Sequence, residues 1–180
     1  MLKLCLIAFV RRTKMSKRDK YPDSDARKFV LGGLKYKGIT LKDIAKIAYG
    51  LEKDYVNGLT LGMCKDAVNK VLDKRDVLSL CMTGLELDRL AEHNLLKEPL
   101  LSIVKNDLGL FSVDEVFGSA ICNLFFTIAV TNYGFIDKKK IGKVKDLDES
   151  KEHCNTFIDD LVGAIAAAAA AKIAHDHNGD

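Results

Sequence analysis

The feature that most constrains this chain is a run from Val116 to Ile136 that contains no charged residue. A run of this length matches the roughly 20 residues that a helix needs to cross a bilayer. Asparagines, threonines and two glycines interrupt it, however, and dilute its hydropathy. The next apolar stretch, Leu161 to Ala171, is roughly half a span and mostly alanine. We therefore expect no transmembrane span but two buried helices, with the uncharged run at the centre of a bundle because it is apolar all round.

Helix signals recur along the rest of the chain, and strand signals are almost absent. No alternating β-branched run occurs, no Asn-Gly turn joins strand-like segments, and the chain has only two prolines. Apolar residues at helical spacing, bounded by caps or glycines, predict helices over 25–36, 40–55 and 60–74, from Thr83 onward and after Pro99. The sequence predicts an all-α, single-domain bundle of about seven helices around a central apolar helix. This domain covers residues 23–176, and residues 1–22 are expected to form a disordered or interfacial tail.

Charge and cysteine spacing argue against several classes of partner and site. A net charge of +3, without a basic stripe carrying aromatics, predicts no nucleic-acid partner. The five cysteines are widely spaced and form no C-x-x-C pair, which predicts reduced thiols in a cytoplasmic protein. The four histidines show no zinc-binding spacing.

Two pairs of adjacent carboxylates lead into the two apolar segments. Asp114 and Glu115 precede the first, and Asp159 and Asp160 precede the second, each pair with a glycine four residues after its first acid. Adjacent helical residues point about 100° apart, so one acid of each pair can turn inward. A buried acid is costly unless it has a partner or a cation. Oxygen ligands without nearby Cys or His suit a hard ion, above all Mg²⁺.

Helix capping is the structural alternative for each pair. Ser112 with Glu115 has capping-box spacing, and Thr156 with Asp159 is a weaker version. Acids in a first turn also complement the helix dipole. Taken singly, each pair can therefore be explained without any ligand.

Three motifs in order resemble those of the phosphatidylglycerophosphatase A family. They are Asp114-Glu115-Val-Phe-Gly118, Asp137-x-x-Lys140 and Asp159-Asp160-Leu-Val-Gly163. The resemblance covers roughly Leu80 to Ala174 and is closest to the soluble, cytosolic branch of Gram-positive bacteria, which is all-helical. Ile141 stands where the family usually has proline after the lysine.

The resemblance implies an Mg²⁺-dependent phosphatase that converts phosphatidylglycerophosphate to phosphatidylglycerol in phospholipid synthesis. The implied metal ligands are Asp114, Glu115, Asp159 and Asp160. Asp137 is expected to ligate the metal or to position the attacking water, and Lys140 to neutralise a phosphate oxygen. For the last two residues, a helix end carrying cations is the alternative.

Four polar residues are weaker candidates for the same site: Glu86, Asp88, Asn132 and Tyr133. Glu86 also fits a capping role behind Thr83. Asp88 could be surface charge, and the other two could belong to a turn.

The expected partner is the headgroup phosphate of a phospholipid, reached from the cytoplasm at the inner membrane face. Basic residues near the N-terminus could help the protein to sit on an anionic surface. Two alternatives remain. One is a non-catalytic helical homo-oligomer in which the acids are caps and the alanines form a subunit seam. The other keeps the metal chemistry but acts on a soluble phosphomonoester. We also expect a homo-oligomer, because bundles with small-residue helices often pack symmetrically.

Overall fold

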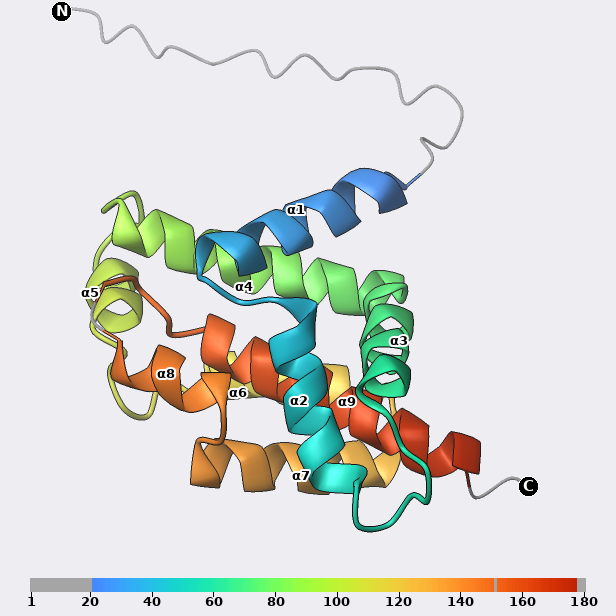
Figure 1. The fold of residues 1–180 in the computed structure, drawn as a ribbon. Helices are drawn as coiled ribbons and strands as arrows, with labels where there is room; N and C mark the ends of the chain where they lie inside the picture. Colours follow the sequence, from blue (N-terminus) through green and yellow to red (C-terminus); the bar gives the residue numbers. More distant parts are fainter. Residues whose placement is uncertain (1–20, 151, 178–180) are drawn as a thin grey trace, which may run out of the picture.

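The structure, a computed structural model, describes residues 21–150 and 152–177, and this part of the chain is helical without strands (Figure 1). Its nine helices are α1 (Asp23–Tyr36), α2 (Leu41–Glu52), α3 (Leu61–Leu72), α4 (Arg75–Glu92), α5 (Leu100–Lys105), α6 (Val113–Asn123), α7 (Phe126–Lys139), α8 (Lys143–Glu149) and α9 (Ile158–His177). The all-α prediction is confirmed, with nine helices in place of about seven. Among these helices, none is long and apolar enough to cross a membrane.

Helix α9 forms the centre of the bundle. It packs against α2, α3, α6, α7 and α8, and it passes between them in Figure 1. From Ala164 to Ala171 every side chain is fully buried. Alanine allows this arrangement, because its single methyl group lets neighbouring helices approach on every side without steric conflict.

The expected position of the uncharged run was wrong. It is divided between α6 and α7, with a turn at Leu124 and Phe125, and it packs beside α9. Asn123 ends α6, where its side chain donates to the carbonyl of Ser119 at 2.9 Å. The run also keeps an exposed apolar side, because Val116 is 60% exposed. Absence of charge therefore did not identify the most buried helix.

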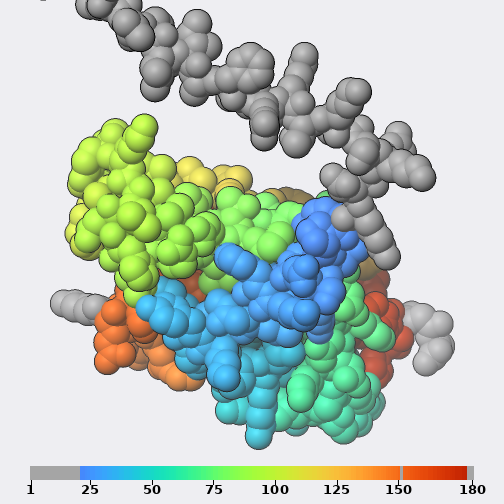
Figure 2. Space-filling view, turned by 90° about the horizontal axis from the view of Figure 1, so that it is seen from above, coloured from blue at the N-terminus to red at the C-terminus, as the bar shows by residue number. Residues whose placement is uncertain are grey.

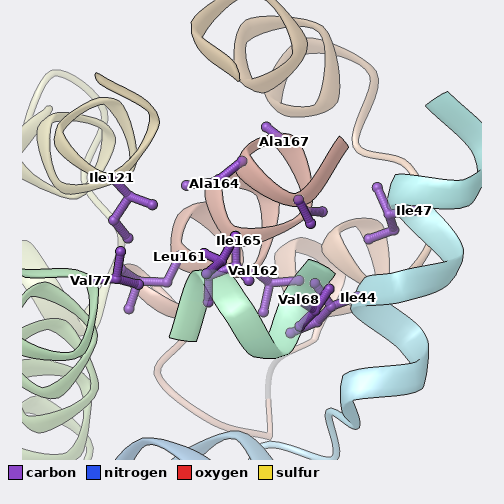
Figure 3. Close-up of a cluster of buried hydrophobic side chains, with 14 of the residues drawn as sticks. Ile44, Ile47, Val68, Val77, Ile121, Leu161, Val162, Ala164, Ile165 and Ala167 are labelled. Carbon is purple, nitrogen blue, oxygen red and sulfur yellow. The ribbon is translucent and has the colours of Figure 1, made fainter. Parts of the chain in front are cut away.

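Branched side chains from four other helices surround α9. Figure 3 shows this cluster, in which the labelled residues outside α9 are Ile44 and Ile47 of α2, Val68 of α3, Val77 of α4 and Ile121 of α6. They surround Leu161, Val162 and Ile165 of α9, all at most 1% exposed. Burying each such side chain contributes about 1.5–3 kcal/mol, so this cluster fixes α9 in the bundle.

Helix starts follow the capping signals in two places and not in a third. Thr40 and Asp43 form the reciprocal capping box of α2, and Thr60 accepts the N–H of Met63 in α3. Thr83 does not start a helix. It lies inside α4, where its hydroxyl donates to the carbonyl of Ser79 at 2.9 Å, because the apolar period of α4 already begins upstream.

Helices α1 to α5 form an outer layer over α9. Figure 2 shows this face, on which little of the red C-terminal helix is visible. Helix α1 packs on α4, and Tyr21 before it is hydrogen-bonded to Ser79 at 2.8 Å. The other residues of the expected tail, 1–20, lie outside the described residues, as does Cys5. The four described cysteines are buried and form no disulfide: Cys64, Cys81, Cys122 and Cys154.

Candidate active site

A polar pocket of about 180 Å³ opens where the N-terminal ends of α6 and α9 meet the C-terminal end of α7. The loop over residues 107–112 completes its wall. The pocket is lined by all six first-rank candidates from the three motifs: Asp114, Glu115, Asp137, Lys140, Asp159 and Asp160. The chain between α7 and α9 returns to the same side of the bundle, so residues far apart in sequence share one cavity.

Lys140 is the cation among these acids. It is the C-cap of α7, and a left-handed backbone (φ 45°) directs the chain away from the helix there. Its Nζ lies 2.9 Å from Asp137, 3.1 Å from Asp159 and 3.4 Å from Asp148. Burial alone would lower the pKa of Lys140, but the attraction of Asp159 and Asp137 outweighs it and raises that pKa. Lys140 therefore stays charged inside the pocket.

Asp159 and Asp160 start α9 and are both buried. Burial raises the pKa of Asp159 to about 6, although Lys140 opposes the shift. Burial and the charge of Asp159 raise the pKa of Asp160 to about 8. Near neutral pH, Asp160 thus holds a proton unless a cation takes its place.

Tyr133 of α7 orients Asp160. Its hydroxyl donates to Oδ1 of Asp160 at 2.6 Å, and the ring is buried. Burial and the nearby Asp160 charge raise the pKa of Tyr133, so the hydroxyl remains a donor. Tyr133 was only a weaker candidate from the sequence, and the structure places it directly behind the pocket.

The two motif glycines lie against α7, and one of them makes room for this tyrosine. A Cβ on Gly118 would overlap Cζ and Oη of Tyr133. A Cβ on Gly163 would lie 3.3 Å from Ile136 and 3.7 Å from the Tyr133 ring. Gly118 therefore lets α6 approach the ring that holds Asp160, whereas Gly163 mainly leaves room for Ile136 of α7.

Asp88 lies beneath the pocket. Its carboxylate, fully buried on α4, accepts the N–H of Phe157 and of Ile158, each at 3.0 Å. Burial raises the pKa of Asp88 to about 8, against these two bonds. Asp88 thus caps α9 from another helix and fixes where Asp159 and Asp160 begin.

The two local capping boxes that could have explained the acid pairs are not formed in the described chain. Ser112 has a left-handed backbone (φ 56°) and makes no side-chain cap bond. The Thr156 hydroxyl donates instead to the carbonyl of Val104 at 2.5 Å. Asp88 takes over the cap of α9, which releases Asp159 to face Lys140.

Two weaker candidates lie outside the pocket. Glu86 is paired with Arg89 on the surface of α4, with its Oε1 2.7 Å from the guanidinium. Asn132 lies on α7 and does not line the cavity.

Two acids near Lys140 were missed from the sequence. Asp107 lines the pocket before Gly109, a loop signal that could have been noticed, whereas Asp148 in α8 lies in a charged stretch with no distinguishing pattern.

The donor set fits a hard cation. Oδ1 of Asp114 is buried and has no hydrogen-bond partner in the described chain. All the lining acids offer oxygen, the donor that Mg²⁺ prefers. Within residues 21–150 and 152–177, however, no three His, Cys, Asp or Glu side chains form a ready-made metal cluster. Mg²⁺ commonly takes one or two carboxylates and completes its shell with waters and phosphate, so a full protein cage is not required.

Comparison with known proteins places the chain among helical relatives. The model of the family Phosphatidylglycerophosphatase A matches residues 28–175. Uncharacterized protein YpjQ of Bacillus subtilis is 46% identical over 144 residues, which are 80% of this chain and 81% of that protein. Uncharacterized protein YutG of the same organism is 43% identical over 162 residues, 89% of this chain and 96% of that protein. The crystal structure of YpjQ superimposes with a TM-score of 0.83 at 42% identity, over 88% of this chain and 98% of that one.

Proposed function

Because the chain belongs to the phosphatidylglycerophosphatase A family, we propose that it hydrolyses phosphatidylglycerophosphate to phosphatidylglycerol with Mg²⁺ as its cofactor. Family membership supports a phosphatase, a phosphoric monoester hydrolase, in phospholipid metabolism. One observation carries the finer proposal. Three motifs from three helices contribute six side chains to one pocket, in which Lys140 is the cation and Asp114 keeps an unpartnered oxygen.

The proposed ligands of Mg²⁺ are Asp114, Glu115, Asp159 and Asp160. When bound, the ion would polarise the phosphoryl group and lower the pKa of a bound water. Asp160 is held in place by Tyr133, so its position does not depend on the ion. Oδ1 of Asp114 needs a partner, and a cation would satisfy it.

Lys140 and Asp137 act on the substrate in this proposal. Lys140 carries a positive charge inside the pocket and would bind a phosphate oxygen, which stabilises the charge that develops during phosphoryl transfer. Asp137 is half-exposed and accepts from Lys140 at 2.9 Å. Once the phosphate engages Lys140, Asp137 would be free to orient the attacking water and to take its proton.

The size of the pocket limits what can enter. A cavity of about 180 Å³ has room for a phosphate with its glycerol, and in this proposal the acyl chains stay outside it. A soluble phosphomonoester would fit the same space. Parallel assays with glycerol 3-phosphate and with phosphatidylglycerophosphate therefore decide between the lipid and a soluble substrate.

The test is phosphate release from phosphatidylglycerophosphate in detergent micelles, with Mg²⁺ or with a chelator. We expect Asp160→Asn and Lys140→Met to lower kcat/KM by on the order of a hundredfold, as loss of one charged group in a preorganised site does. Matched controls are Glu86→Gln and Lys28→Met, at a surface acid and a surface lysine outside the pocket. These controls should keep wild-type turnover.

Circular dichroism melts check that each variant folds. Turnover that survives in Asp160→Asn, or that does not depend on a divalent cation, contradicts the proposed site. If folded wild-type protein turns over neither substrate, the non-catalytic alternative gains support.

A further inference from the structure

The rim of the acidic pocket carries apolar side chains that the described chain leaves uncovered. Leu110 is 100% exposed and Leu108 is 47% exposed, and both line the pocket. Val113 and Val116, at the start of α6, do not line the pocket, but they follow its loop in sequence and are 40% and 60% exposed. We call these four residues the apolar rim. Single exposed leucines are common, but a group of them at the mouth of a polar pocket marks an interaction surface.

The loop backbone holds Leu110 away from the bundle. Leu110 has a left-handed conformation (φ 70°), as do Asp107 (φ 47°) and Ser112 (φ 56°) on either side. A positive φ is uncommon for a leucine. Strained residues of this kind cluster at ligand clamps and other functional sites. The backbone conformation of the loop therefore leaves the Leu110 side chain exposed to solvent instead of buried in the bundle.

Exposed lysines lie next in sequence to Lys140 of the pocket. Lys138 and Lys139 are exposed at the end of α7, directly before Lys140 in the pocket. Phe135, one turn earlier on the same helix, is 49% exposed. Apolar side chains beside lysines match the surface of an anionic bilayer, where the apolar groups enter the headgroup region and the lysines meet lipid charge.

We propose that the apolar rim inserts into the surface of an anionic phospholipid bilayer and opens the pocket onto the headgroups. This inference rests on the proposed function, since a lipid substrate must deliver its phosphate while its acyl chains stay in the membrane. A second copy of the chain is the other apolar partner to consider. It fits less well, because covering Leu108 and Leu110 would close the pocket that they line.

Tryptophan fluorescence tests the insertion directly. The chain has no tryptophan, so Leu110→Trp introduces a single reporter. The matched control is Tyr55→Trp, at a position 83% exposed in the α2–α3 connection. With vesicles of equal parts phosphatidylglycerol and phosphatidylcholine, we expect a blue shift of the emission of Leu110→Trp and none for the control. No shift at residue 110, or equal shifts at both positions, overturns the proposal.

Vesicle binding and turnover separate this inference from the proposed function. We expect Leu110→Ser to bind the same vesicles about tenfold more weakly in flotation assays, and Tyr55→Ser to bind like wild type. For the activity test we use Val116→Ser, a variant of the apolar rim whose side chain does not line the pocket. Its turnover of vesicle-embedded phosphatidylglycerophosphate should fall with its vesicle binding, while its turnover of a short-chain, monomeric analogue stays unchanged. Binding that depends on Leu110 without any turnover would support the inference and refute the phosphatase. A concentration-dependent shift of Leu110→Trp without vesicles would assign the rim to a second copy and overturn the inference.

Discussion

Tyr133 connects the acidic motifs at the scale of single residues. Its ring fills the space that Gly118 leaves and lies near Gly163, and its hydroxyl donates to Asp160 at 2.6 Å. Asp160 is buried, and its pKa of about 8 reflects that burial and the neighbouring Asp159. A hydrogen bond from the neutral hydroxyl of Tyr133 thus orients Asp160. Once it is ionised, this buried acid needs a cation to balance its charge.

Tyr133→Phe should make Asp160 harder to ionise. The hydroxyl bond lowers the pKa of Asp160, so its loss moves that pKa further above about 8. If the ionised acid binds Mg²⁺, the rising limb of the pH–rate profile and of Mg²⁺ affinity should shift to higher pH. Stability should change by only about 1 kcal/mol. Profiles of wild type and variant measured side by side check this, and identical profiles would contradict a role for Tyr133 in positioning Asp160.

At the scale of elements, the contact between α6 and α7 depends on Gly118, which has no side chain. Gly118 lies against the Tyr133 ring, where a Cβ has no space. Gly134, one residue after Tyr133, has space for a Cβ: apart from its chain neighbours and the nearby backbone of its own helix, no heavy atom of the described chain would lie within 4 Å of it. Gly118, which packs against Tyr133 from another helix, therefore has no room for a side chain, whereas Gly134, which follows Tyr133 in the chain, has room for one.

Gly118→Ala should destabilise the protein by about 1–3 kcal/mol, because the added methyl group pushes α6 and α7 apart. Gly134→Ala should be neutral or stabilising by about 0.5–1 kcal/mol, since alanine is the better helix former and nothing opposes it. Urea denaturation measures both, and Mg²⁺ affinity shows whether the displaced ring disturbs Asp160. Equal effects of the two substitutions would mean that the α6–α7 contact is not limited by this ring.

At the scale of the whole molecule, folding concentrates acids in the interior at the start of α9. Asp88, Asp159 and Asp160 all have pKa values raised by burial, to about 8, 6 and 8. For Glu92, hydrogen bonds outweigh burial, and the pKa is lowered instead of raised. Burial alone would raise its pKa, but bonds from Lys37, His153 and Tyr36 lower it to about 2. Near neutral pH the fold therefore holds some acids as protonated groups and others as paired charges.

Without a divalent cation, stability should fall as the pH rises from about 4 to about 8. In this window the unfolded chain has released protons that the folded acids still hold, so the slope of unfolding free energy against pH is negative. Glu92 opposes this slope only at the lower end of the window, where the unfolded chain still releases the Glu92 proton near its ordinary pKa of 4.5, and its contribution is constant at higher pH. Urea midpoints measured in EDTA across this range check the sign.

Two comparisons sharpen the pH experiment. Asp160→Asn cannot titrate at that position and should reduce the slope. Mg²⁺ should stabilise the wild type more at about pH 8 than at about pH 5, because protons compete with the ion for the acids. A slope of the opposite sign in EDTA would show that the buried acids are ionised in the folded protein.

The sequence by itself determined the features that depend on near neighbours. Helical content follows from local apolar periodicity, and the starts of α2 and α3 from caps that lie three residues from their partners. The motif residues could also be chosen from the sequence, because the three motifs occur together in the order that resembles the phosphatidylglycerophosphatase A family.

Tertiary structure decided what depends on distant parts of the chain. It placed α9 at the centre, because an alanine surface accepts neighbours on all sides while larger side chains keep one face exposed. It gave the cap of α9 to Asp88, about seventy residues away in sequence. It also added Asp107 and Asp148 to the surroundings of Lys140. Burial and long-range charge set these roles, and neither can be determined from a local pattern.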